Sequence, residues 1–243
     1  MKRGLVSVIM PARNASAYIE EAIRSVIAQS YTSWELLIVD NGSTDNTYDI
    51  AHSFLDSRIT VLREPHKLGI GYARNKAMHE MVGEYFCFLD ADDRLTPDSL
   101  SCRIGLFQQD PELSFVDGWV ETWNRDFSQC SSVCKPSFRG YPLHEVVSLS
   151  ARCVCAVSWM VRRKPGIEYR FMEGWSHAED LAFYISIARQ GKYSYTEQPV
   201  YQVRRGHQST MSDLKGLQDG YGHVLRYMQT IPELSNEELE AAR

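Results

Sequence analysis

Short apolar runs alternate with amphipathic segments along the first 110 residues of the chain. Four runs have the length and composition of buried strands: Leu5–Met10, Leu36–Val39, Ile59–Leu62 and Tyr85–Leu89. Apolar residues at helical spacing predict helices after Ser16, over Thr47–Leu55, over Ile70–Val82 and after Thr96-Pro97-Asp98. Ser16 and the Thr96-Pro97 pair are expected to provide the cap and N1 positions of their helices. This alternation predicts an α/β fold with a mostly parallel sheet and helices on both faces.

The second half of the chain is less regular. Strands are expected over Leu113–Trp123, Val154–Val161 and Tyr193–Val203, with a polar loop over Asn124–Arg139. Helices are expected over Trp175–Gln190 and in the tail Leu217–Arg243, which Pro232 interrupts. We therefore expect one domain over residues 1–212, with halves 1–110 and 111–212, followed by a helical tail over 213–243.

Composition excludes some classes of protein and leaves the cysteines open. The chain has 243 residues and a net charge of −5, which argues against a nucleic-acid surface. No apolar run approaches the roughly 18 residues of a membrane span, and the apolar segment before Pro11 is too short for a signal peptide. The chain is expected to be cytoplasmic. The six cysteines include Cys130-x-x-x-Cys134 and Cys153-x-Cys155, for which a four-thiolate zinc site is a weak alternative.

Three carboxylates end the fourth apolar run. Asp90-Ala91-Asp92-Asp93 directly follows a buried strand, where ligands bind in open α/β sheets. Hard oxygen ligands at such an edge suit Mg²⁺ or Mn²⁺, with phosphates completing the shell. The alternative is a solvated acidic loop. Asp40 ends the second strand in the same way, although Asp-Asn-Gly-Ser is also ordinary turn chemistry.

Two further segments follow strands at this edge. Pro11-Ala12-Arg13-Asn14 places Arg13 where it meets either a phosphate or solvent. Gly69 and Gly71 begin a helix that favours anions, and Arg74 lies one turn into it. No G-x-G-x-x-G follows the first strand and no P-loop motif occurs, so dinucleotide and P-loop functions lose their main support.

Acids also begin the late helix. Ser176 and Glu179 fit a capping box, which gives Glu179 a structural task. Asp180 is then the acid available as a general base, because a helix N-terminus keeps a carboxylate ionised. His207, after the last strand, is a metal-ligand candidate or an exposed loop residue. Aromatic residues surround this region, and Trp175 is the one expected to contact a sugar: Trp159, Phe171, Trp175 and Tyr184.

Together these ordered motifs resemble the family 2 glycosyltransferases of the GT-A fold. The resemblance is dense over residues 5–110 and sparse over 170–212, and it runs through the strand-end motifs and Ala178-Glu179-Asp180. It implies that Asp40 binds the base of a nucleotide sugar and that Asp90, Asp92 and His207 hold a metal. It implies Asp180 as the base, with Glu179 as second candidate. The remaining nucleotide-sugar contacts implied are Pro11, Arg13, Lys67, Arg74, Asp90 and Ala91.

The resemblance also implies a reaction. The chain would transfer a sugar with inversion from a nucleotide-diphosphate sugar, with a UDP-hexose favoured, to a hydroxyl of a glycan or lipid-linked acceptor. Mn²⁺ or Mg²⁺ is the expected cofactor. Peripheral association with the inner face of a membrane is compatible with a lipid-linked acceptor. Ala12, Arg13 and Asn41 stand where relatives often carry aromatic residues or a second Asp. The alternatives are a sugar-nucleotide nucleotidyltransferase and a catalytically silent nucleotide-binding domain.

Overall fold

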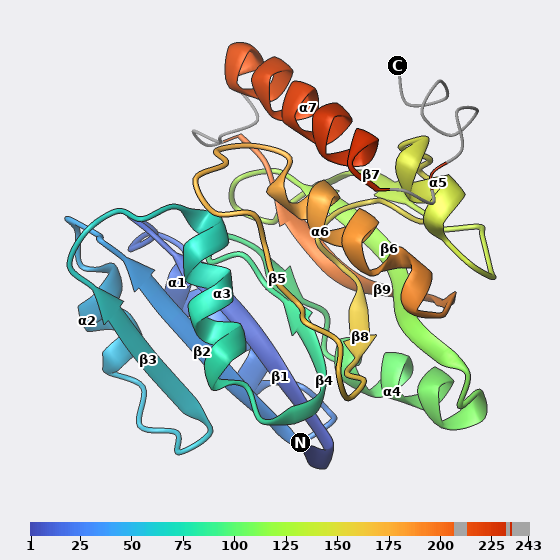
Figure 1. Ribbon diagram of the computed structural model, residues 1–243. Helices are drawn as coiled ribbons and strands as arrows, with labels where there is room; N and C mark the ends of the chain where they lie inside the picture. The colour runs from blue at the N-terminus through green and yellow to red at the C-terminus, as the bar shows by residue number, and fades with distance from the viewer. Residues whose placement is uncertain (207–212, 232–233, 235–243) are drawn as a thin grey trace.

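A mixed, mostly parallel β-sheet forms the centre of the molecule (Figure 1). The computed structural model describes residues 1–206, 213–231 and 234, and within them the strand order is β3-β2-β1-β4-β8-β6-β9-β5, with β7 paired to β6. The strands are β1 (Lys2–Ala12), β2 (Trp34–Asn41), β3 (Ile59–Glu64), β4 (Gly83–Phe88), β5 (Arg94–Leu95), β6 (Leu113–Trp123), β7 (Cys130–Cys134), β8 (Met160–Arg162) and β9 (Lys192–Arg204).

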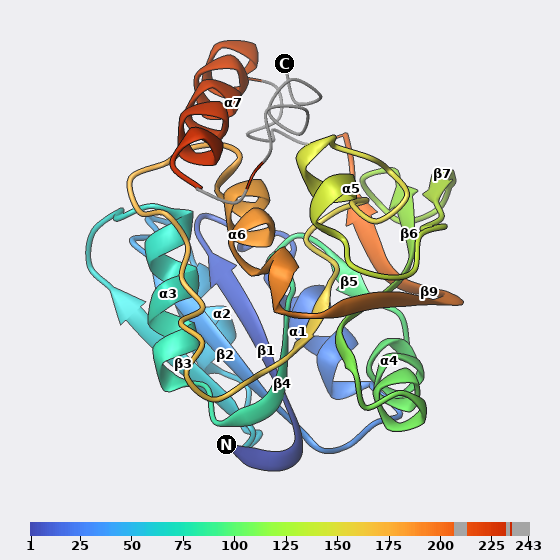
Figure 2. The same ribbon diagram turned by 45° about the vertical axis from the view of Figure 1, so that its right-hand side comes forward.

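Helices cover both faces of this sheet (Figures 1 and 2). They are α1 (Ile19–Ile27), α2 (Thr47–His52), α3 (Ile70–Glu80), α4 (Ser99–Gln109), α5 (Leu143–Val147), α6 (Glu179–Ile187), with a 3-10 turn at Ala188–Gln190, and α7 (Leu214–Gln229). Side chains alternate across β1, so that Val8 packs with α1, α2 and α4 while Ile9 packs with α3, α5, α6 and α7. The α/β class and the parallel first half predicted from the sequence are confirmed.

Several predicted boundaries are wrong, among them the starts of two helices. Ser16 lies before α1, and its backbone N–H donates to the Asp45 carboxylate at 3.1 Å. Thr96 and Pro97 lie before α4, and the Thr96 hydroxyl donates to the carbonyl of Pro199 at 2.5 Å. Both predicted cap residues contact a residue distant in the sequence, and each helix begins two or three residues later.

The polar middle of the chain also differs from the expectation. The predicted loop Asn124–Arg139 contains strand β7, and α5 was not predicted. The predicted strand Val154–Val161 is regular only from Met160. Cys134 and Cys155 form a disulfide, while Cys153 is buried and Cys130 is exposed. Two of the four thiols are therefore paired with each other, and the four-thiolate zinc alternative is wrong.

A carboxyl group lies in the centre of the sheet. Asp117 of β6 is fully buried, and burial raises its pKa to about 6. Its Oδ1 accepts from the Gly118 N–H at 2.8 Å, and the Tyr193 hydroxyl lies 3.4 Å from Oδ2. These contacts only partly replace the water that an ionised carboxylate loses on burial.

Helix α7 packs closely against the segment that leads into α6. Val224 and Met228 of α7 are buried in the same core cluster as α6. In the part of the chain that the structure describes, no helix combines the length and apolar composition needed to cross a membrane.

Helix α7 can approach the segment before α6 closely because it carries glycine at the contact: a Cβ at Gly220 would lie 2.8 Å from the carbonyl oxygen of His177.

This contact predicts opposite effects for two alanine substitutions on α7. Gly220→Ala should lower the free energy of unfolding by about 1–3 kcal/mol, because the new methyl overlaps the backbone of His177. Gly222→Ala is the matched control, since its Cβ meets only Arg226 at 3.6 Å. It should raise stability by up to about 1 kcal/mol through helix propensity. Urea denaturation measures both; equal effects would show that α7 does not depend on this contact.

Candidate active site

The carboxyl ends of β1, β2 and β4 lie side by side at one edge of the sheet. Ala12 is the register partner of Asp40, and Ile9 is the partner of Phe88, two residues before Asp90. The parallel pairing therefore brings the strand-end residues of three separate motifs to a common edge. Pro11 and Ala91 are both buried there.

Asp40 is a buried carboxylate with open hydrogen-bonding capacity. It is 1% exposed, and neither of its oxygens has a hydrogen-bond partner among the described residues. Its nearest cation is Arg63, whose Nε lies 3.8 Å away on a largely exposed side chain. An unsatisfied buried carboxylate is costly, so this arrangement is that of a group held ready for a donor from a ligand.

The loop before α3 packs against the turn that follows Asp40. Asn41 Oδ1 accepts from the Leu68 N–H at 2.8 Å. Gly42 has φ of 69°, and a Cβ there would lie 2.6 Å from the backbone nitrogen of Lys67. Lys67 itself is exposed on this loop. Asn41 thus holds the rim of the site.

The loop after β1 is fastened to the same turn. Asn14 accepts from the Thr44 N–H at 2.9 Å, and its own N–H donates to the Ser43 hydroxyl at 3.0 Å. The Ala15 N–H donates to the Thr47 hydroxyl at 2.7 Å. Arg13 is exposed at the outer side of this loop. The Asn-Gly-Ser-Thr-Asp segment is therefore structural, and its contacts fix the loop that borders Asp40.

Strand β9 supports the acidic turn after β4. The Asp90 N–H donates to the Tyr201 hydroxyl at 3.0 Å. Arg204 donates its backbone N–H to Asp93 at 2.7 Å and its Nε–H to the carbonyl of Asp92 at 2.8 Å. Tyr201 and Arg204 were not assigned to the site from the sequence. The feature that brings them to the site is the pairing of β9 with β5. Because β5 is only two residues long, the sequence pattern did not reveal this pairing.

Arg74 lies buried between the two acidic segments. It is 1% exposed, with Nη1 2.8 Å from Glu179 and Nη2 3.0 Å from Asp90. Burial alone would lower the pKa of Arg74, but the charges of Asp90, Glu179 and Asp180 raise it above its usual range. The side chain is thus turned toward protein carboxylates at the point where the resemblance implied a nucleotide contact.

The capping box predicted at Ser176 is wrong. Helix α6 begins at Glu179, and its N-cap is Ala178 in a left-handed conformation with φ of 59°. Glu179 is buried and bonded to Arg74, so it does not reach back to Ser176. Burial raises the pKa of Glu179, and Arg74 opposes that shift while Asp180 adds to it. Asp180 is half-buried, and its Oδ1 accepts from the Leu181 N–H at 2.8 Å.

The acidic turn has the donor chemistry of a divalent-cation site. Asp90 and Asp92 offer hard carboxylate oxygens, the ligands that Mg²⁺ and Mn²⁺ prefer. Burial, and then the charges of Asp92 and Asp90, raise the pKa of Asp93 well above its usual value, which marks a surplus of negative charge. Within the described residues no three His, Cys, Asp or Glu side chains form a ready metal cluster. The carboxylates of Asp90 and Asp92 fit a divalent cation that also takes ligands from a bound phosphate group.

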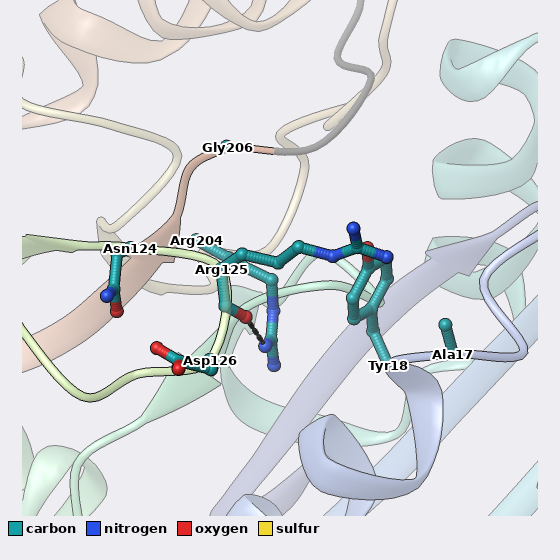
Figure 3. A pocket seen from close by; sticks show the side chains of 7 residues that line it. All are labelled: Ala17, Tyr18, Asn124, Arg125, Asp126, Arg204 and Gly206. Carbon is teal, nitrogen blue, oxygen red and sulfur yellow. Dashed lines mark hydrogen bonds between the residues drawn. The ribbon is translucent and has the colours of Figure 1, made fainter.

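A cavity of about 600 Å³ lies beside this turn. Figure 3 shows it between the residues that precede α1, the β6–β7 turn and the end of β9, with Arg125 extended toward Tyr18. Arg204 lines the cavity and also donates to Asp92 and Asp93, so this one residue connects the cavity wall to the acidic turn.

The predicted aromatic residues divide into two groups. Trp159, Phe171 and Tyr184 are buried in the core at 1% exposure or less. Trp175 is half-buried, and its ring centroid lies 5.1 Å from that of His223 on α7. His207 lies outside the described residues.

Comparison with known proteins agrees with this geometry. The model of the family described as "Glycosyl transferase family 2" matches residues 7–169. An uncharacterized glycosyltransferase of Haemophilus influenzae is 35% identical over 217 residues, which cover 88% of this chain and 84% of that protein. The fold and its acidic edge are those of a GT-A glycosyltransferase. The chain belongs to glycosyl transferase family 2.

Other relatives are matched over part of their length. The Escherichia coli UDP-Glc:alpha-D-GlcNAc-diphosphoundecaprenol beta-1,3-glucosyltransferase WfgD is 38% identical over 122 residues, 50% of this chain. That match spans about half of the relative, 48% of its length.

Two solved structures share the fold. Staphylococcus aureus TarS 1-349 with UDP-GlcNAc has a TM-score of 0.77 at 17% identity, covering 98% of this chain and 70% of that one. The Pyrobaculum calidifontis mannosyltransferase PcManGT with GDP-Man and Mn²⁺ has a TM-score of 0.66 at 21% identity, covering 97% and 68%. At these identities the likeness concerns the fold.

Proposed function

We propose that the chain transfers a hexose from a UDP-sugar to a hydroxyl group of a glycan or lipid-linked acceptor, with inversion at the anomeric carbon. The observation that carries the proposal is Asp40, a buried carboxylate with both oxygens unsatisfied at the carboxyl edge of a parallel sheet. The names of the relatives support the class of donor and acceptor, since WfgD uses UDP-Glc and a diphosphoundecaprenol-linked sugar.

Asp40 restricts the base of the nucleotide. An ionised carboxylate only accepts hydrogen bonds, so its ligand must present an N–H. Uracil does so through its imino N–H, whereas cytosine and adenine present an exocyclic amino N–H beside a ring nitrogen that is an acceptor and repels the carboxylate. Guanine also offers an N–H but is a larger ring system. The relative WfgD is named for a UDP-Glc donor, which supports uracil over guanine. We therefore favour uridine diphosphate.

The acidic turn is proposed to receive the diphosphate. Asp92, Asp90 and His207 are the proposed ligands of Mn²⁺ or Mg²⁺. When bound, the cation supplies Lewis-acid stabilisation of the leaving diphosphate, whose negative charge grows in the transition state. Pro11, Arg13, Lys67 and Ala91 are proposed to line the nucleotide-sugar site around it. Asp90 and Asp92 are held in place by hydrogen bonds with Tyr201, Arg204 and Arg74.

Asp180 is the proposed base. The acceptor oxygen forms its bond to the anomeric carbon as the bond to the diphosphate breaks, and Asp180 takes the hydroxyl proton. Glu179 is the second candidate, but its Oε1 is bonded to Arg74 in a buried pair. A carboxylate oxygen that already accepts from a guanidinium is not available to an acceptor hydroxyl, and this favours Asp180. Residues 111–212 are proposed as the acceptor-binding half, in which Trp175 contacts the acceptor. The enzyme is proposed to associate with the inner face of a membrane.

A nucleotide panel tests the proposed donor. UDP with Mn²⁺ should raise the melting temperature more than CDP or ADP with Mn²⁺. Asp40→Asn should weaken UDP binding by about 10- to 100-fold, the scale of a charged hydrogen bond. The same change should stabilise the ligand-free protein, because it removes a buried charge whose oxygens accept no hydrogen bond among the described residues. Asp49→Asn, on the exposed side of α2, is the control and should change neither quantity. A preference for GDP would overturn the donor assignment.

Metal dependence is tested by one substitution in two conditions. Transfer should require Mn²⁺ or Mg²⁺ and stop when EDTA is added. Asp92→Ala should weaken UDP binding in Mn²⁺ by at least about tenfold but change it little in EDTA, because only the metal-bridged contact is lost. Isothermal titration calorimetry measures both affinities. Equal loss with and without metal would remove Asp92 from the metal site.

The two acids at the start of α6 are separated by kinetics. Asp180→Asn should fold normally, bind UDP normally and lose roughly 10²–10⁴ in kcat, the usual contribution of a general base. Glu179→Gln should retain more activity, since Gln still accepts from Arg74. Steady-state rates on a UDP-hexose and a lipid-linked acceptor give the comparison. If Glu179→Gln is inactive and Asp180→Asn active, Glu179 is the base.

A further inference from the structure

We infer that Arg74 is a positioning residue that sets the distance between the donor side and the acceptor side of the active site. The inference rests on the proposed function, because it names Asp90 as a donor-side acid and Asp180 as the base. It assigns Arg74 a task other than nucleotide contact, since both terminal nitrogens of its guanidinium are bonded to protein carboxylates.

The guanidinium joins two segments that are far apart in the sequence. Nη2 donates to Asp90 at 3.0 Å, in the turn after β4, and Nη1 donates to Glu179 at 2.8 Å, at the start of α6. Asp92 is two residues from one end of this bridge, and Asp180 is one residue from the other. The bridge therefore spans the gap between the proposed metal ligand and the proposed base.

The surroundings leave Arg74 little freedom. Its guanidinium carbon lies 5.0 Å from the ring centroid of Phe171 and 5.7 Å from that of Phe88. Asn75, the next residue, bonds both the N–H and the carbonyl of Phe171, at 2.7 and 3.0 Å. The chain segment that leads into α6 is thus clamped onto α3 beside Arg74. A side chain so enclosed holds its partners in fixed geometry.

Arginine is well suited to this bridge. Its planar fork presents separate N–H groups to two acceptors in a fixed geometry, whereas the lysine ammonium is a compact charge on a flexible stem. Lysine at position 74 would preserve the positive charge but would hold Asp90 and Glu179 less rigidly. A displacement of about 1 Å between reacting groups can cost about 10²-fold in rate. The bridge is thus expected to act on kcat, with little effect on nucleotide affinity.

Arg74→Lys is the test, and Arg103→Lys is its matched control. Arg103 is also fully buried, but it bonds Ser99 and the carbonyl of Ser158, on the opposite face of the sheet. Arg74→Lys should lower kcat about 10- to 100-fold, with the UDP–Mn²⁺ dissociation constant and the donor KM within threefold of the wild-type values. Arg103→Lys should lower the melting temperature while kcat of the folded enzyme stays unchanged.

Three results would overturn the inference. A loss of UDP affinity with kcat preserved would show that Arg74 contacts the nucleotide. A lower melting temperature with both constants preserved would show a purely structural role. Equal losses of kcat in Arg74→Lys and Arg103→Lys would show a general effect of buried arginines. If the wild-type enzyme transfers no sugar from any donor, the proposed function fails, and this result is distinct from the other three.

A second variant keeps the test valid if Arg74→Lys does not fold. The double variant R74Q/E179Q removes one positive and one negative charge, so the net charge of the site is unchanged and no new unpaired charge is created at Glu179. It should fold, bind UDP–Mn²⁺ like the wild type and show a kcat about 10- to 100-fold below that of Glu179→Gln alone, because the bridge to Asp90 is lost. A double variant with wild-type kcat would contradict the inference.

Discussion

Repulsion among carboxylates is the constraint on which the rest of the site depends. Asp90, Asp92 and Asp93 share one short turn, and Glu179 and Asp180 lie across Arg74 from it. Negative charges so close destabilise one another, and at Asp93 the charges of Asp92 and Asp90 add to burial in raising the pKa well above its usual value. The fold offsets this with the buried Arg74, the backbone and guanidinium of Arg204 and the N-terminus of α6. The turn still retains the negative charge that a cation would neutralise.

The sequence was sufficient where local pattern and topology agree. Apolar runs ending in polar residues predicted strands β1 to β4 within a few residues, because buried parallel strands have a composition that little else shares. The same rule predicted that Asp40 and Asp90 would lie at one edge, which the pairing of β2, β1 and β4 confirms. Family 2 membership followed from the order of these motifs and is confirmed as well.

The sequence was insufficient where a side chain has a partner distant in the chain. Ser16, Thr96 and Ser176 all have the local pattern of helix caps, yet each helix begins later. Arg74 looked like a ligand-facing residue because nothing near it in the sequence reveals Glu179, 105 positions away. Tyr201 and Arg204 were missed for the same reason. The roles of Asp180, Asp92 and Trp175 stay predictions, since geometry places them without showing what they bind.

The buried Asp117 links the core of the sheet to the acidity of the solution. Its pKa in the folded protein is about 6, whereas an aspartate in an unfolded chain titrates near 4. Between these two values folding takes up a proton, so the contribution of this group to stability is fully present below about pH 4 and is lost as the pH rises through about 6. The difference amounts to at most about 3 kcal/mol. Mild acid destabilises proteins that depend on ionised carboxylates. At Asp117 it has the opposite effect, because protonation removes the free-energy cost of a buried negative charge at neutral pH.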